Sequence, residues 1–169
     1  MRGATEAMRI EPQAGDTGFF GRYRVRTGDG PHYDVEIRSL SEFINSCSCP
    51  NHRTNGLGTC KHIEATLLRL QSRRKRAFRE AAGAGSPFIE IFLDRRDRQV
   101  RIHWPRGGQR RSTAHDLLAP LFNDQGILRG TPLDTLPALE RSINAVPARV
   151  RRRIRISREL NPVARSARP

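Results

Sequence analysis

Three cysteines and one histidine within sixteen residues constrain this chain more than any other feature of its sequence. They form two doublets, Cys47-Ser48-Cys49 and Cys60-Lys61-His62, and the chain contains no other cysteine. In an extended segment, residues i and i+2 point to the same side, so each doublet presents two ligand atoms to one point. Three thiolates and one imidazole complete the tetrahedral shell that Zn²⁺ prefers. The sequence therefore predicts one bound Zn²⁺.

A complete shell leaves no coordination position for water, which favours a structural ion over a catalytic one. Its binding would act as folding free energy for a module too small to be stable alone. Three alternatives stay open: buried cysteines with a capping histidine, a redox pair of Cys47 and Cys49, and His52 in place of His62. His62-Ile63-Glu64 has the His-x-Glu pattern of zinc deaminases, but those enzymes place their cysteines after it. We expect no catalytic residues and no small-molecule substrate.

The residue pattern predicts an α+β fold with two parts. Segments 20–26 and 33–38 alternate apolar and charged residues across Gly28-Asp29-Gly30, which indicates a β-hairpin. A helix is expected from His62 to about Ala82, with its first turn at the second ligand doublet. The expected organisation is a disordered tail (1–18), a zinc-stapled hairpin-plus-helix module (19–82), a linker (83–87), a second small α+β lobe (88–160) and a disordered tail (161–169).

The second lobe has a simpler pattern. Two strands are expected over 88–93 and 99–104, joined by a charged turn. Helices are expected over 112–122 and 133–144. A last strand is expected over 150–156, where isoleucines alternate with arginines.

The charge of the chain indicates the kind of partner. It has 29 Arg and 2 Lys against 17 acidic residues, a formal net charge of +14. Such a balance favours nucleic acid over an acidic small molecule, because it attracts polyanions. The alternative is a set of solvated basic surfaces without a partner. The residues expected to contact phosphates are Arg69, Arg73, Arg74, Lys75, Arg76, Arg79, Arg110, Arg111, Arg151, Arg152 and Arg153.

The sequence also bears on location. No run approaches the roughly 18 apolar residues of a membrane span. The first 18 residues lack the apolar core of a signal peptide. We therefore expect a cytoplasmic protein with no membrane partner.

The run Cys-Ser-Cys-Pro followed by Cys-Lys-His-Ile-Glu-Ala, after a Tyr-x-Val hairpin, resembles the SWIM zinc finger over about residues 19–80. That family includes regions of bacterial SNF2-like ATPases, MuDR-like transposases and some ubiquitin ligases. The resemblance implies Cys47, Cys49, Cys60 and His62 as zinc ligands. It also implies binding to DNA or protein, a bacterial nucleoid-associated role and an SNF2-like ATPase as partner. The chain has no G-x-x-x-x-G-K-[ST] phosphate loop of its own. The rival interpretation is a protein–protein adaptor that does not touch nucleic acid.

Overall fold

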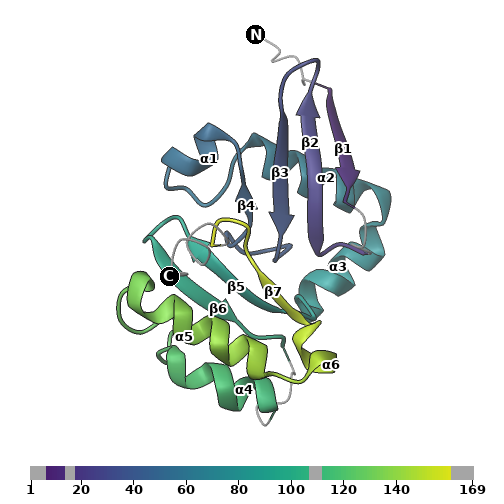
Figure 1. Ribbon diagram of the computed structural model, residues 1–169. Coiled ribbons are helices and arrows are strands. Elements are labelled where there is room, and N and C mark those ends of the chain that lie inside the picture. The colour runs from purple at the N-terminus through teal and green to yellow at the C-terminus, as the bar shows by residue number, and fades with distance from the viewer. Residues whose placement is uncertain (1–6, 14–17, 107–111, 161–169) are drawn as a thin grey trace. The chain divides into compact units, whose positions relative to one another are not determined.

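The chain folds as an α+β protein, as the sequence predicts. The structure is a computed structural model and describes residues 7–13, 18–106 and 112–160. It divides into two compact units, Met1–Ser86 and Pro87–Pro169, whose elements are labelled in Figure 1. The division falls within the segment 83–87 that was expected to be a linker.

The first unit contains an antiparallel sheet in the order β1-β2-β3-β4 (Figure 1). Its strands are β1 (Met8–Pro12), β2 (Gly21–Thr27), β3 (His32–Ile37) and β4 (Ser46–Cys47). The predicted hairpin is β2 and β3, with Tyr23 opposite Val35 and Val25 opposite Tyr33. Tyr23, Val25 and Val35 are buried, whereas Arg22 and Arg24 are exposed. The alternation in the sequence is therefore the alternation between the two faces of the sheet.

Strand β1 corrects the prediction of a disordered tail over residues 1–18. Met8–Pro12 pairs with β2, and Ile10 lies opposite Val25 and is buried. Met8, Ile10 and Pro12 alternate with Arg9 and Glu11, so the sequence does carry a strand pattern there, but it is only five residues long. The edge of β2 that does not pair with β3 supplies the backbone hydrogen bonds that hold these five residues in a strand.

Helices follow the two halves of the cysteine cluster. They are α1 (Pro50–Thr54), α2 (Lys61–Arg73) and α3 (Lys75–Ala84). The sequence predicted one continuous helix from His62 to Ala82, which is wrong at Arg74, where φ is −145° and ψ is 59°. The break allows Phe78 of α3 to pack edge-on against Phe19, with ring centroids 5.6 Å apart. The Arg74 guanidinium lies over the same Phe19 ring, 5.5 Å from its centroid.

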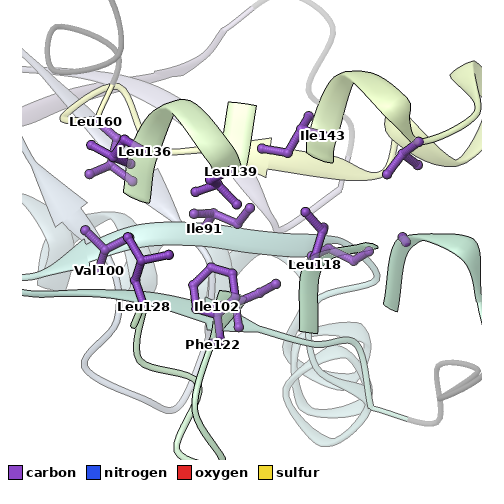
Figure 2. Packing of buried hydrophobic residues seen from close by; sticks show 13 residues of the cluster. Ile91, Val100, Ile102, Leu118, Phe122, Leu128, Leu136, Leu139, Ile143 and Leu160 are labelled. Carbon is purple, nitrogen blue, oxygen red and sulfur yellow. The ribbon is translucent and has the colours of Figure 1, made fainter. Parts of the chain in front are cut away.

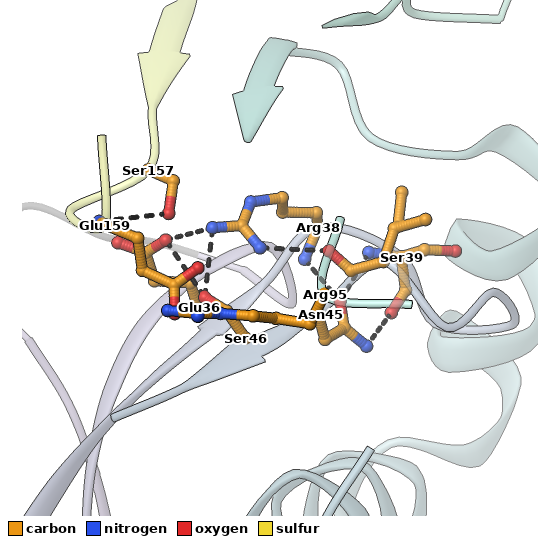
Figure 3. Close-up of polar contacts among 9 residues, drawn as sticks. Glu36, Arg38, Ser39, Asn45, Ser46, Arg95, Ser157 and Glu159 are labelled. Atoms are coloured by element: carbon orange, nitrogen blue, oxygen red, sulfur yellow. Dashed lines mark hydrogen bonds and ion pairs between the residues drawn. The ribbon is translucent and has the colours of Figure 1, made fainter. Parts of the chain in front are cut away.

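A buried polar network shapes the chain between β3 and β4 (Figure 3). Arg38, only 3% exposed, donates to the carbonyl of Ile44 at 2.9 Å and to Ser46 Oγ at 3.1 Å, and it pairs with Glu36. The Asn45 side-chain oxygen accepts the backbone N–H of Arg38 at 2.7 Å. These bonds fix the path that returns the chain to the sheet one residue before Cys47.

The second unit has a three-stranded sheet in the order β6-β5-β7. Its elements are β5 (Ile89–Asp94), β6 (Gln99–His103), α4 (Thr113–Leu118), the 3-10 turn η1 (Ala119–Leu121), α5 (Pro132–Ala145), α6 (Ala148–Arg151) and β7 (Ile154–Ile156). β6 is antiparallel to β5, and β7 is parallel to it. The predicted last strand over 150–156 is too long, because Pro147 caps a short helix and its carbonyl accepts the N–H of Val150 and Arg151, both at 2.9 Å.

An apolar core holds the second unit together (Figure 2). Ile91 of the central strand is completely buried, and Leu118 of α4 is equally inaccessible. Leu136, Leu139 and Ile143 of α5 belong to the same cluster, at the i, i+3, i+7 spacing of one helix face. This unit therefore has a hydrophobic core of its own, made of apolar side chains.

Candidate metal centre

The first ligand doublet lies where the sheet gives way to a helix. Cys47 ends β4 and lies opposite Val35. Cys49 is the N-cap of α1, with extended backbone angles of −68° and 148°. Both cysteines are thus on extended backbone, and the i, i+2 spacing brings their sulfurs to one side as the sequence predicts. The one-turn helix α1 was not expected; Pro50 at its first position favours it.

The second doublet begins α2. Cys60 is the N-cap residue in extended conformation, and His62 is the second residue of the helix. The hydroxyl of Thr66, one turn further along α2, donates to the backbone carbonyl of His62 at 2.7 Å, and both residues are buried. Between the doublets, Gly56 and Gly58 have φ of 65° and 72°, a region that favours glycine. They allow the chain to fold back from α1 to Cys60.

The four side chains converge. Cys47, Cys49, Cys60 and His62 are all buried, and their ligand atoms lie within 4.8 Å of one another. His62 Nδ1 is 3.7 Å from Cys47 Sγ and 4.0 Å from Cys60 Sγ. A tetrahedral zinc site with ordinary Zn–S and Zn–N bonds has N···S edges of about 3.6 Å. The donor set and its spacing fit one metal ion with a closed shell.

The surroundings favour a thiolate at Cys60 and a neutral thiol at Cys47 and Cys49. The hydrogen bond from the Cys47 thiol lowers the pKa of Cys60 to about 5, with the Ile63 and His62 backbone N–H groups assisting against burial. The same bond to Cys60, together with burial, raises the pKa of Cys47. Burial also raises the pKa of Cys49, although the His52 N–H donates to its sulfur at 3.4 Å. A divalent cation would compensate the charge that burial disfavours on these thiols.

His52, the alternative ligand, is buried at 1% exposure in α1. Among the described residues, its ring is not part of the cluster that could hold a metal. Its observed contact with the site runs through its backbone N–H to Cys49. The geometry therefore favours His62 as the fourth ligand.

The basic residues expected to contact nucleic acid fall in two places. Arg69 is half-buried on α2, whereas Arg73, Arg74, Lys75, Arg76 and Arg79 are exposed around the junction of α2 and α3. Arg151, Arg152 and Arg153 are exposed in the second unit, at the end of α6 and in the turn after it. Arg110 and Arg111 lie outside the described residues. The structure thus gathers five of the predicted side chains at one corner of the first unit.

Tyr33 is a neighbour of the site that sequence reasoning missed. Its ring packs against the His62 imidazole, with centroids 4.7 Å apart and planes inclined by 38°. Only the pairing of β3 with β4 and the docking of α2 bring the two rings together. The Tyr-x-Val pattern marked Tyr33 as part of a strand and gave no sign of this contact.

The chain was compared with protein-family models, curated proteins and solved structures. No family model, curated protein or solved structure matches the chain. Within the described residues, no helix has both the length and the apolar character needed to cross a membrane.

Proposed function

We propose that the first unit is a zinc-stabilised module that binds nucleic acid, DNA foremost, and performs no catalysis. The observation that carries the proposal is the buried Cys47, Cys49, Cys60 and His62 cluster at the start of α2. A closed shell of this kind holds backbone in place and offers no position for substrate. Function is then expected on the surface that the metal orders.

Helix α2 links the cluster to the basic corner. His62 is at its first turn and Arg73 is its last residue, a distance of about 16 Å along a helix at 1.5 Å per residue. The segment from Arg73 to Glu80 contains five exposed cationic residues and one acidic residue, Glu80, which pairs with Arg76 at 2.9 Å. Guanidinium groups bind phosphate oxygens well, and such contacts supply affinity without sequence preference.

The finer assignment rests on the resemblance of residues 19–80 to SWIM zinc fingers. On that basis we place the chain as an accessory to an SNF2-like ATPase system, or as part of one, in a bacterial cytoplasm. Copurification with such an ATPase from native cells would test this assignment.

Salt-dependent binding to a duplex tests the nucleic-acid proposal. Fluorescence anisotropy with a labelled 20-base-pair DNA should show binding at 50 mM salt that weakens steeply by 200 mM. Replacing Arg73 and Lys75 with Gln should weaken binding and lower the slope of log K against log salt by about 2. No binding at low salt by the zinc-loaded chain would overturn the proposal.

The matched control is the double variant Arg22→Gln, Arg24→Gln. It removes the same charge from the exposed face of β2, where these arginines lie opposite Glu36 and Asp34. Its binding should stay close to that of the wild type. Equal losses in both double variants would mean that net charge, and not the α2–α3 corner, governs binding.

A second function is favoured by exposed apolar side chains. Phe43, Leu57 and Leu68 of the first unit are 56%, 66% and 63% exposed. Exposed apolar side chains mark protein–protein interaction sites where they form a contiguous patch. If the duplex experiment fails, a protein–protein adaptor becomes the leading function.

A further inference from the structure

Tyr33 is outside the set of candidate ligands but contacts one of them, His62. The geometry points to Tyr33 as the positioning residue that holds His62 with Nδ1 toward the sulfurs, so that Nδ1 is the fourth ligand atom. The inference deepens the proposed metal site and rests on it.

The choice of nitrogen follows from distances. Nδ1 lies 3.7 Å and 4.0 Å from the sulfurs of Cys47 and Cys60, close to the N···S edge of about 3.6 Å in a tetrahedral zinc site. The imidazole belongs to the second residue of α2, only two residues after Cys60. Because this connection is so short, the ring nitrogen nearer to the backbone, Nδ1, is the one that faces the sulfurs. Nε2 is then left as the protonated nitrogen on the far side of the ring.

The position of Tyr33 explains why the ring stays in place. Tyr33 is on the same side of β3 as Val35, whose partner across the strands is Cys47. The pairing continues past β4, because the Ser48 N–H donates to the carbonyl of Asp34 at 2.9 Å. Tyr33 therefore flanks the shell on the side where β4 has ended, and its ring covers the imidazole at 4.7 Å.

Such a contact affects the metal in two ways. It restricts rotation of the imidazole, so less rotational freedom is lost when the metal binds. It also covers one side of His62 and hinders water from replacing this ligand. Outer residues that orient a ligand commonly change metal affinity by about 10- to 100-fold.

Cobalt and zinc binding to the full chain test the role of Tyr33. We expect wild-type protein loaded with Co²⁺ to show the intense visible bands of a tetrahedral site with three sulfurs and one nitrogen. Tyr33→Leu should bind Zn²⁺ at least about tenfold more weakly in competition with a chelator, with weakened, shifted Co²⁺ bands. Tyr33→Phe keeps the ring and should match the wild type in both measurements.

Tyr23→Leu is the matched control for general destabilisation. Tyr23 is on β2 of the same sheet and is 4% exposed, with its hydroxyl donating to the carbonyls of Gly18 and Phe19 at 3.1 and 3.0 Å. Its loss should lower stability while leaving the Co²⁺ spectrum of the folded protein unchanged. An equal spectral change in Tyr23→Leu, or none in Tyr33→Leu, would overturn the inference.

A measurement on the wild type keeps the inference testable even if Tyr33→Leu does not fold. Long-range ¹H–¹⁵N correlation spectra of the zinc-loaded protein report which nitrogen of His62 carries the proton. A proton on Nε2 supports the assignment, whereas metal on Nε2 overturns it. If the wild type binds neither Zn²⁺ nor Co²⁺, the proposed metal site itself fails. If it binds both and Tyr33→Leu behaves like the wild type, only the role of Tyr33 fails.

Discussion

Cys60 is the thiol best prepared to bind a cation. It accepts the Cys47 hydrogen bond and the N–H groups at the start of α2, and these lower its pKa against the effect of burial. The hydrogen bond to Cys60 and burial raise the pKa of Cys47, and burial raises the pKa of Cys49, so a bound cation would favour the thiolates of both. The four side chains therefore act as one unit, and removing one ligand should affect them all.

Cys60→Ser tests the ligand set. A hydroxyl is a poor substitute for a thiolate on zinc, so zinc affinity should fall by more than the roughly 10- to 100-fold typical of an outer residue. Competition with a chromogenic chelator measures the loss. His52→Gln serves as the comparison and should keep one zinc per chain. Normal zinc binding by His62→Gln together with its loss in His52→Gln would reverse the choice of histidine.

Asp94 is the residue on which the charged turn of the second unit depends. Its carboxylate is 4% exposed and accepts the Arg96 side chain at 3.0 and 2.8 Å, with Arg101 at 3.3 Å. Burial raises the pKa of Asp94, but the hydrogen bonds and charge of Arg96 and the charge of Arg101 outweigh it, so the net pKa is lowered. A lowered folded-state pKa stabilises the fold above the unfolded value of about 4, and the gain is lost as pH falls through the folded value.

Asp94→Asn should destabilise the second unit by about 1–3 kcal/mol at pH 7, because hydrogen bonds to a charged group are lost. At pH 3, below the unfolded value of about 4, the difference should shrink, because the unfolded wild-type chain takes up a proton at Asp94 more readily than the folded one. Urea unfolding followed by the fluorescence of Trp104, the single tryptophan, measures both. Asp97→Asn, on the exposed side of the same turn, should cost only about 0–1 kcal/mol. An equal Asp94→Asn deficit at both pH values would contradict this account.

At the scale of elements, the position of α3 in the first unit depends on the helix break at Arg74. The helix break at Arg74 lets α3 return and place Phe78 on Phe19. Phe78 is 7% exposed and is the buried residue of α3. The contacts of Phe78 and Arg74 with the Phe19 ring therefore help to hold the arrangement of the exposed cations on both sides of the break.

Phe78→Ala should detach α3 from Phe19 and destabilise this helix. A buried Phe→Ala substitution costs about 3–5 kcal/mol, which is more than a ten-residue helix gains by itself in water. Hydrogen exchange should show faster amide exchange over Lys75–Ala84, while the first turns of α2 stay protected by the metal. Uniform loss of protection over α2 and α3 would mean that the two helices form one cooperative element.

At the scale of the whole molecule, each of the two units is stabilised internally in a different way. The first surrounds a cluster of side chains that could hold a metal ion with a small sheet and two longer helices. The second buries an apolar core, to which thirteen of its described residues belong. The stabilities of the two units should therefore respond differently to loss of metal.

Chelation of zinc should unfold the first unit and spare the second. Structural zinc contributes about 10–16 kcal/mol of binding free energy in zinc-finger peptides, as much as the whole stability of a typical domain, about 5–15 kcal/mol. Amide protection in β2, β3 and α2 should disappear after addition of a strong chelator. Trp104, which packs against the core of the second unit, should keep its emission maximum. Simultaneous loss of both signals would show that the units fold as one.

Local patterns in the sequence identified the features that depend on near neighbours. The two ligand doublets, the hairpin of β2 and β3, and the start of the helix at the second doublet follow from spacing, alternation and turn residues within about ten positions. The prediction of a disordered tail was wrong at Met8–Pro12, and that of a single helix over 62–82 was wrong at Arg74, where a distant partner decides in each case. The rest of that tail over 1–6 and 14–17, and the tail predicted over 161–169, lie outside the described residues. Ile10 needs the edge of β2, and the break at Arg74 needs Phe19.

The sequence by itself determined which side chains can hold a metal and that an α+β fold surrounds them, because ligand chemistry and residue periodicity are local properties. The tertiary structure alone decided which nitrogen of His62 faces the sulfurs and that Tyr33 covers its ring. It also decided that α2 ends at Arg74, so that α3 places Phe78 against Phe19. The pairing of strands and the docking of helices decide these contacts, because Tyr33 and His62, and likewise Phe19 and Phe78, are separated by about thirty to sixty positions in the sequence.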